Sequence, residues 1–204
     1  QGGDNPRARH GDEGLAIGRD TMQPIEDFVD EAVRDKKPFF VWYAPFLPHT
    51  PHNPPERLLA KYRDRAPSLS EATYYAMVDW LDETCGQMFD HIAKKGADKN
   101  TVVAYVADNG WFPNPAKVGT NVRSKLTPYD AGLRTPILLS WPGKIAARRI
   151  DQPVSSIDLM PTLLKCAGID PPPGLPGIDL RDEAAVLKLD AIVGAIFTHD
   201  AVDL

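Results

Sequence analysis

The stretch Thr101-Val-Val-Ala-Tyr-Val-Ala-Asp-Asn-Gly110 decides the fold class of this chain. Its first residues are mostly apolar and β-branched, which predicts a short buried strand. The strand leads directly into Asp108, Asn109 and Gly110, two oxygen-bearing side chains and a residue that can adopt a positive φ. Open α/β sheets bind ligands at the carboxyl ends of their strands, so we expect a ligand-bearing loop here. The alternative is a hairpin with an Asn-Gly turn, which two prolines in the following residues disfavour.

Helical and strand patterns alternate along the chain, which is typical of α/β proteins. Thr21 is suited to cap a helix that continues to about Lys36. Residues 38–44 form a continuous apolar run, which predicts a strand buried on both faces. The longest helix is expected from Ser70 to about Lys95.

Apolar residues at helical spacing predict which side of each helix faces the core. The first helix would bury Ile25, Phe28, Val29 and Ala32, and the longest helix Val78, Leu81, Cys85, Phe89 and Ile92. Further elements are expected at 56–64 (helix), 136–141 (strand), 156–164 (helix) and 191–197 (strand).

The composition is that of a globular protein, with 43% hydrophobic and 25% charged residues among 204. No run of eighteen apolar residues is present, so no membrane span is predicted. A net charge of -5 argues against a nucleic-acid partner. The two cysteines, Cys85 and Cys166, lie in apolar patterns, and core thiols are favoured over a disulfide. The polar start without an initiator Met suggests that the chain begins inside a longer polypeptide.

A proline-rich loop at 45–55 carries His49 and His52. Its five prolines restrict the backbone, so the two histidines are held with little conformational freedom. An imidazole can give or take a proton near neutral pH. The alternative is that both are ordinary solvated loop residues.

The long segment 110–134 is expected to be irregular and is locally basic. Lys117, Arg123, Lys125 and Arg134 outweigh its single acidic residue, Asp130. Positive charge beside a polar strand end is what an anionic substrate requires. We therefore expect a functional loop rather than an idle one.

Asp108 and Asn109 offer hard oxygen ligands, which suit Ca²⁺ or Mg²⁺ rather than zinc. A calcium site takes roughly six to eight oxygens, and no other acidic cluster in the chain would complete the shell. A nucleophile is missing too, since no Gly-x-Ser-x-Gly or P-loop motif occurs. The residues therefore predict half of a metal site without the group that attacks.

Five stretches, in order, carry a resemblance to the type I sulfatases of the alkaline-phosphatase superfamily. They are Ala44-Pro-Phe-Leu-Pro-His-Thr-Pro51, Val106-Ala-Asp-Asn-Gly110, Lys125-Leu-Thr-Pro-Tyr-Asp-Ala-Gly-Leu-Arg-Thr-Pro136, Trp141-Pro-Gly-Lys-Ile145 and Ser156-Ile-Asp-Leu-Met-Pro-Thr-Leu-Leu164. The resemblance implies a three-layer α/β/α sandwich with a mostly parallel central sheet, incomplete at both ends. Residues 1–190 would be part of the catalytic domain, and 191–204 the start of a small C-terminal subdomain.

The resemblance also implies roles for individual residues. Asp108 and Asn109 look like ligands of the family's divalent cation, usually Ca²⁺, with Mg²⁺ as an alternative. His49 is similar to the histidine that protonates the leaving oxygen. Lys125 resembles the lysine that contacts the sulfate. His52 and Arg123 are expected to contact substrate, although neither matches an assigned family role, and Arg123 could instead fix the loop.

The family's nucleophile is a formylglycine in a Cys/Ser-x-Pro-x-Arg motif, which neither cysteine of this chain matches. The resemblance therefore implies that the N-terminal half of the domain, with the formylglycine and further acidic ligands, lies outside this chain. The parent protein would hydrolyse a sulfated small molecule or carbohydrate, and this chain alone would be inactive. The alternatives are a phosphonate or phosphate ester hydrolase of the same superfamily, and a non-catalytic binding protein that kept the fold. A periplasmic or secreted location is suggested by the family only.

Overall fold

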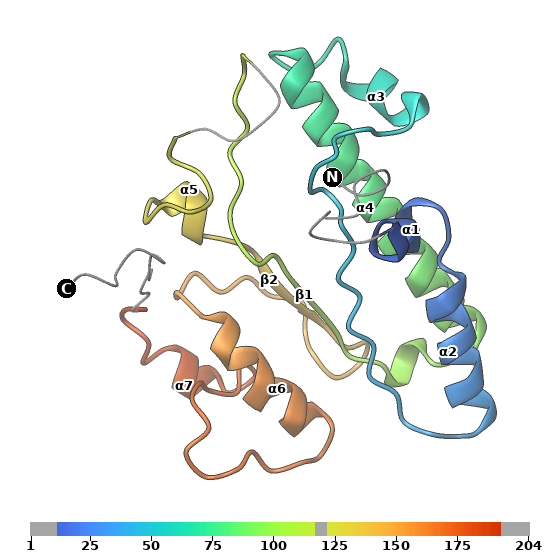
Figure 1. Ribbon diagram of the computed structural model, residues 1–204. Helices are drawn as coiled ribbons and strands as arrows, with labels where there is room; N and C mark the ends of the chain where they lie inside the picture. Colours follow the sequence, from blue (N-terminus) through green and yellow to red (C-terminus); the bar gives the residue numbers. More distant parts are fainter. Residues whose placement is uncertain (1–11, 117–121, 193–204) are drawn as a thin grey trace, which may run out of the picture. The chain divides into compact units, whose positions relative to one another are not determined.

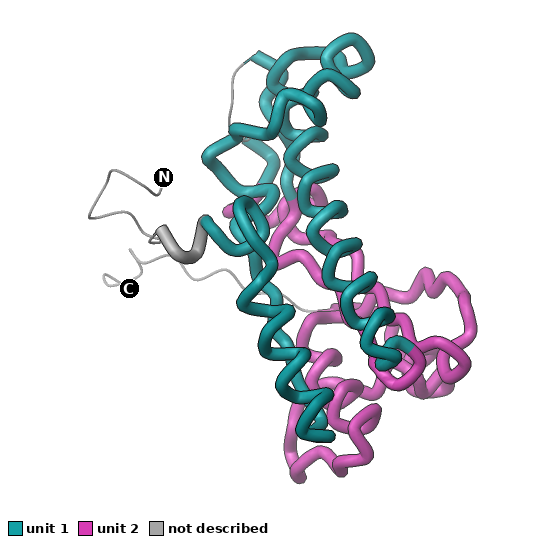
Figure 2. The backbone as a smooth tube through the Cα atoms, turned by 90° about the vertical axis from the view of Figure 1, so that its right-hand side faces the viewer, with its two compact units in different colours: residues 1–98, 111–124 teal, residues 99–110, 125–204 magenta. Residues whose placement is uncertain are grey.

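The chain forms two compact units in a computed structural model that describes residues 12–116 and 122–192 (Figure 2). Unit 1 comprises residues 1–98 and 111–124, and unit 2 comprises residues 99–110 and 125–204. Residues 193–197 of the strand predicted at 191–197, and with them most of the expected C-terminal subdomain, lie outside the described residues. Within the described part, no helix is both long and apolar enough to cross a membrane.

Unit 1 is built around one long helix, α4 (Figure 1). Its helices are α1 (Asp12–Arg19), α2 (Gln23–Arg34), α3 (Glu56–Tyr62) and α4 (Leu69–Lys94). Both α2 and α3 pack on α4. The Asp30 carboxylate of α2 contacts His91 and Lys95 at the C-terminal end of α4, each at 2.7 Å.

The N-terminus of α4 lies slightly earlier than the sequence predicts. Ser68, not Ser70, is the N-cap, and its hydroxyl accepts a hydrogen bond from the Glu71 amide at 3.2 Å. The glutamate side chain accepts a bond back from the same hydroxyl at 2.8 Å, which stabilises the first turn. Because either serine can cap a helix, only the observed bond decides between them.

The predicted core face of α4 is wrong in part. Its buried residues are Ala72, Ala76, Met77, Thr84 and Ile92, of which the prediction named only the last. Val78 and Phe89 are each 41% exposed. The small side chains Ala72 and Ala76 are fully buried while these larger ones are exposed, so the buried face is not the most hydrophobic one. For α2 the prediction is better, since Val29 and Ala32 are buried while Phe28 is exposed.

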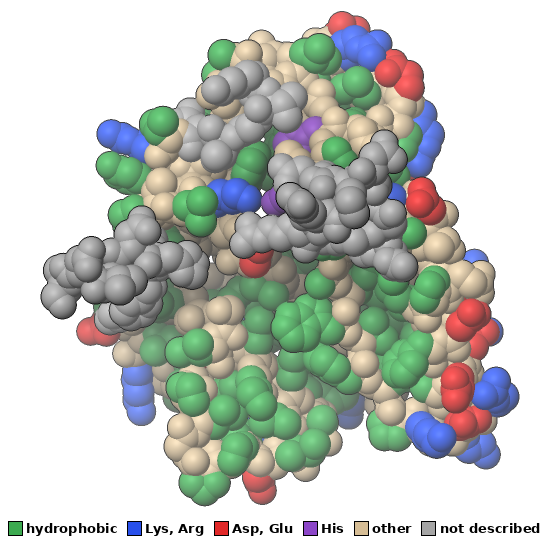
Figure 3. All heavy atoms as spheres, in the orientation of Figure 1, with side chains coloured by type: hydrophobic (Ala, Val, Ile, Leu, Met, Phe, Trp, Pro, Cys, Tyr) green, Lys and Arg blue, Asp and Glu red, His purple; other side chains and the backbone are tan. Residues whose placement is uncertain are grey.

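Residues 38–44 are not a doubly buried strand, which corrects the prediction. No strand is assigned there, and Phe40 and Trp42 are 70% and 83% exposed. Exposure nevertheless alternates from residue to residue, as in an extended backbone. On the covered side, the Tyr43 hydroxyl donates to Thr84 of α4 at 2.8 Å. One face therefore packs on α4 while the other stays open. Figure 3 shows that many hydrophobic side chains lie at the molecular surface.

Unit 2 contains the two strands β1 (Val103–Val106) and β2 (Ile137–Ser140), both within predicted ranges. The predicted burial of β1 is wrong, since its last three residues are exposed. They pair antiparallel, with Val103 opposite Ser140 and Val106 opposite Ile137. The two described strands are therefore antiparallel, whereas the expected sheet is mostly parallel. Because the partner of β1 lies 30 residues further along the chain, the hairpin interpretation of Asn109-Gly110 is wrong.

The remaining elements are η1 (Asp98–Asn100), α5 (Asp130–Leu133), η2 (Ser156–Asp158), α6 (Leu159–Cys166) and α7 (Glu183–Val186). The helix predicted at 156–164 corresponds to η2 followed by α6. Both cysteines are free thiols, as predicted, but their burial is intermediate rather than that of core residues.

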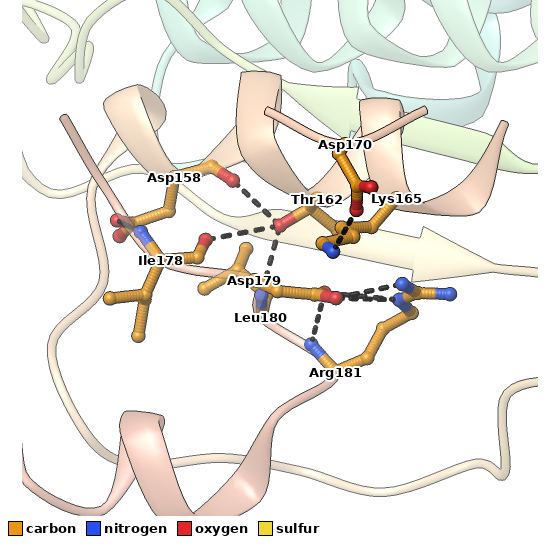
Figure 4. Close-up of polar contacts among 8 residues, drawn as sticks. All are labelled: Asp158, Thr162, Lys165, Asp170, Ile178, Asp179, Leu180 and Arg181. Atoms are coloured by element: carbon orange, nitrogen blue, oxygen red, sulfur yellow. Dashed lines mark hydrogen bonds and ion pairs between the residues drawn. The ribbon is translucent and has the colours of Figure 1, made fainter. Parts of the chain in front are cut away.

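A buried polar network fastens the segment after α6 to the start of that helix (Figure 4). The Asp158 carboxylate accepts bonds from the amides of Ser155 at 2.8 Å and Ile178 at 2.9 Å. The Thr162 hydroxyl donates to the Asp158 carbonyl at 2.6 Å and accepts from the Leu180 amide at 2.9 Å. Within the Ser156–Leu164 stretch, the aspartate and threonine thus have a structural role.

Candidate functional site

The histidine loop, residues 45–55, lies in unit 1 and is bound by Arg19 at the end of α1. One terminal nitrogen, Nη2, donates to the carbonyls of Phe46 at 3.0 Å and His49 at 3.1 Å. The other, Nη1, donates to the Pro51 carbonyl at 3.3 Å and to the Asn53 side chain. Sequence reasoning missed this residue, because the first nineteen residues show no periodicity.

His52 is half-buried in an aromatic cluster and is not an ordinary solvated residue. Its ring centroid lies 6.0 Å from that of Tyr74 and 6.1 Å from that of Trp111. Desolvation lowers the pKa of His52, opposed by a hydrogen bond with the Pro48 backbone and reinforced by His49 and Arg19. The imidazole is therefore held toward its neutral form, in which one ring nitrogen can accept a hydrogen bond.

His49, in contrast, is exposed. Its Nδ1 lies 3.0 Å from the Thr50 carbonyl and 3.2 Å from the Thr50 hydroxyl. When Nδ1 carries the proton and donates to the carbonyl, Nε2 is the unprotonated nitrogen of the neutral ring. The side chain can therefore exchange a proton with a group that approaches from solvent.

The Asp108-Asn109 loop of unit 2 follows β1 and is fixed on both sides by the segment 129–135. Before the loop, the Thr135 hydroxyl donates to the Ala107 carbonyl at 3.1 Å. After it, the Gly110 amide donates to the Gly132 carbonyl at 2.9 Å. These bonds hold the two polar side chains at the end of the strand.

Glycine is required at position 110 for close packing, and not for the positive φ that the sequence suggested. A Cβ atom there would lie 2.3 Å from the Ala131 carbonyl oxygen and 2.9 Å from its carbon. The backbone of residue 110 does not adopt a positive φ. The Tyr129-Asp-Ala-Gly132 stretch thus packs directly against the loop that carries Asp108.

Asp108 is exposed, and Asn109 is half-buried. The Asn109 amide nitrogen donates to the Gly110 carbonyl at 3.0 Å, which orients the side chain and leaves its oxygen as an acceptor. These oxygens fit a hard divalent cation by type. Among the described residues, no group of three or more His, Cys, Asp or Glu gathers in a metal-binding arrangement.

The basic residues Arg123 and Lys125 flank a fully buried serine, Ser124. The Ser124 hydroxyl accepts a bond from the Phe112 amide at 2.7 Å, which ties this stretch to the residues after Gly110. Arg123 is exposed, and Lys125 is half-buried. Lys117, the other predicted basic residue of this segment, lies outside the described part.

Leu126, next to Lys125, has a positive φ of 66°, which is uncommon for a residue with a branched side chain. It is also 89% exposed, so packing of its side chain does not compensate for the strain. Strained backbone is frequent where a functional side chain is held in a set position. The sequence gives no signal for this feature.

The predicted site residues are thus divided between the units. Unit 1 carries His49, His52 and Arg123, and it brings the two histidines into electrostatic contact. Unit 2 carries the adjacent pair Asp108-Asn109, and also Lys125. The catalytic, substrate-binding and metal-binding roles expected of these six residues remain predictions.

Residues 10–169 match the profile of the protein family described as Sulfatase. The chain is 34% identical over 169 residues to arylsulfatase A of Homo sapiens, covering 78% of this chain and 31% of that protein. It is 27% identical over 181 residues to the ulvan-active sulfatase of Formosa agariphila, covering 79% of this chain and 34% of that protein. The chain therefore spans about a third of the length of these curated relatives.

The structure is similar to the crystal structure of Ps i-CgsB in complex with k-i-k-neocarrahexaose. The TM-score is 0.67 at 30% sequence identity, and the likeness covers 78% of this chain and 36% of that chain. Such neighbours have the alkaline-phosphatase-like α/β fold, which confirms the predicted fold class.

Proposed function

Because the chain belongs to the sulfatase family, we propose that it supplies one part of an active site that hydrolyses sulfate esters. The observation that carries the proposal is the family match over residues 10–169, which includes both the histidine loop and the Asp108-Asn109 loop. A sulfated carbohydrate is the proposed substrate class, supported by the ulvan-active relative and by the neighbour in complex with k-i-k-neocarrahexaose.

In this proposal His49 protonates the oxygen of the departing alcohol. Its exposure gives the ring access to a leaving group, and a positioned acid contributes roughly 10²–10⁴-fold to such a step. His52 acts differently, since its lowered pKa and ring contacts favour a neutral hydrogen-bonding contact with substrate.

Lys125 would offset negative charge on the sulfuryl oxygens through its ammonium group. Its half-buried position reduces competition from water, which strengthens the interaction with an anion. Arg123 is exposed, so it would attract the anionic substrate and contact its periphery.

Asp108 and Asn109 would hold the divalent cation, Ca²⁺ or Mg²⁺, together with ligands outside this chain. When bound, this cation supplies positive charge that stabilises the sulfate oxygens. A formylglycine outside this chain would supply the nucleophile. The 204-residue chain alone is accordingly proposed to be inactive.

The test uses the complete catalytic domain that contains this chain, assayed on matched aryl sulfate and aryl phosphate esters. We expect preferential sulfate hydrolysis that is lost on treatment with a chelator and restored by Ca²⁺. Faster hydrolysis of the phosphate ester would instead favour the related phosphoesterase activity. Hydrolysis of either ester by the isolated chain would contradict the proposed division of the site.

A further inference from the structure

We propose that Arg19 is a positioning residue that fixes the backbone of the histidine loop and thereby the place of His49. The inference rests on the proposed acid role of His49, but its structural part can be tested without activity. Arg19 precedes the loop by about thirty residues, so no local sequence pattern connects the two.

The loop needs an external donor because of its composition. Five of the eleven residues in 45–55 are prolines, which have no N–H group to donate. Within the loop, the amide of Asn53 donates to the carbonyl of Pro51 at 3.1 Å. Arg19 supplies further donors for the carbonyls of Phe46, His49 and Pro51.

A guanidinium suits this task because it is planar, always charged and carries five N–H donors in a fixed fork. Both terminal nitrogens of Arg19 contact the loop, and both reach the Pro51 carbonyl at 3.3 Å. Among the described residues, these nitrogens bind carbonyl and amide oxygens and form no ion pair with a carboxylate. The arginine is therefore engaged by the loop and is not available to bind the sulfate.

Arg19 is itself held from the opposite side. Its guanidinium carbon lies 5.5 Å from the ring centroid of Trp80 on α4. A cation above an aromatic ring is attracted to it, so the charge is stabilised where it is partly removed from water. Arg19 thus joins the histidine loop to the longest helix of unit 1.

The contact with the His49 carbonyl links Arg19 to the proposed chemistry. It is made to the backbone carbonyl of His49 at 3.1 Å, so it fixes the main chain that carries the imidazole. A misplacement of about 1 Å in a reacting group can lower the rate by roughly 100-fold. Loss of Arg19 should therefore affect the step in which the alcohol departs more than it affects substrate binding.

Two variants separate positioning from general stability. Arg19→Met keeps an unbranched stem similar to that of arginine but removes every donor, whereas Arg19→Lys keeps the charge and part of the donor capacity. The matched control is Arg57→Met in the same unit. Arg57 of α3 forms a bidentate pair with Glu83 of α4, and it does not contact the histidine loop.

The first measurement follows the loop directly, by NMR of the His49 and His52 rings and by amide hydrogen exchange across 45–55. We expect Arg19→Met to shift both ring signals and to raise exchange in the loop at least tenfold. The ring shifts and the exchange rates of Arg19→Lys should lie between those of Arg19→Met and wild type. Arg57→Met should leave both unchanged. Unchanged loop signals in Arg19→Met would overturn the proposal.

The second measurement uses the complete domain on aryl sulfates with good and poor leaving groups. We expect Arg19→Met to lower kcat about 100-fold for the poor leaving group, with a smaller loss for the good one and little change in KM. An equal loss for both substrates, or the same loss in Arg57→Met, would show a merely structural role. If wild type lacks sulfatase activity, the proposed function fails, while the NMR result still decides whether Arg19 orders the loop.

Discussion

The amide of Gly110 donates a hydrogen bond to the carbonyl of Gly132 at 2.9 Å. The two glycines are 22 residues apart in the chain, and each belongs to a different stretch that resembles the sulfatases. The contact explains why the first of these stretches needs a glycine, since a Cβ atom at position 110 would meet the Ala131 backbone. The loop that carries Asp108 and Asn109 is therefore positioned by the Tyr129–Gly132 segment rather than by its own sequence.

Substitution of Gly110 by Ala should displace this loop. A Cβ atom at position 110 would lie 2.3 Å from the Ala131 carbonyl oxygen, and overpacking of this kind costs about 1–3 kcal/mol. Urea unfolding measures the loss. The control is Gly86→Ala in α4, where a Cβ meets nothing within 4 Å and should raise stability by about 1 kcal/mol. Equal stability of the two variants would contradict the close packing.

The network around Thr162 predicts that Thr162→Val destabilises unit 2. The valine keeps the shape of the side chain but leaves the buried Leu180 amide without its acceptor, which costs about 1–3 kcal/mol. Thermal unfolding provides the measurement. Thr73→Val is the matched control, because the Thr73 hydroxyl bonds only locally to the Leu69 carbonyl on an exposed part of α4. A smaller loss for Thr162→Val than for this control would refute the role of the network.

Backbone strain at Leu126 predicts that glycine is better tolerated there than alanine. Both substitutions remove an exposed side chain. Only glycine removes the strain of the left-handed backbone conformation, which costs a residue with a Cβ about 1–2 kcal/mol. Leu126→Gly should therefore be more stable than Leu126→Ala in urea unfolding. If the strain also holds Lys125 in place, sulfate affinity should fall in the glycine variant despite its higher stability. Equal stability of the two variants would rule out the strain.

The lowered pKa of His52 makes stability depend on pH. The folded state favours the neutral ring and the unfolded state has the ordinary pKa of 6.5, so protonation favours unfolding. The contribution is fully present above pH 6.5 and is lost as the pH falls toward the folded pKa. Urea unfolding of wild type and of His52→Asn at a series of pH values isolates the contribution of His52 to the pH dependence of stability. An NMR titration that placed the His52 pKa above 6.5 would reverse the sign.

The proposed cation site predicts that Asp108→Asn weakens Ca²⁺ binding by the complete domain. The substitution keeps an oxygen at this position but removes its negative charge, and calcium affinity depends on the charge of the ligands. Calorimetric titration should show at least a tenfold loss. Asp170→Asn is the control, since Asp170 is an exposed surface residue paired with Lys165. Unchanged affinity in the Asp108 variant would remove this residue from the site.

The local elements could largely be predicted, because their signals lie within a few residues of sequence. Both described strands and all four predicted helices occur close to their expected ranges. Residues 38–44 show the limit of such reasoning. An apolar run reports that a segment can be buried, but not which neighbours cover it, and one face of this segment is exposed.

The candidate site was predictable where a residue carries recognisable chemistry, and not where it acts through geometry. Histidines, carboxylates and lysines can be selected by type, so His49, Asp108 and Lys125 are visible in the sequence. Arg19, Leu126 and the packing reason for Gly110 are not. Each depends on a backbone conformation or on a partner that is distant in the sequence.

The sequence by itself determined the family and the α/β class, since these depend on residue types at fixed short spacings. Only the tertiary structure decided that Arg19 binds the histidine loop, that Ser68 caps α4 and that Gly110 packs against the Ala131-Gly132 backbone. The physical reason is that hydrogen bonds and close packing select partners by position in space. Contacts between residues 20 or 30 apart produce no periodic pattern in the sequence.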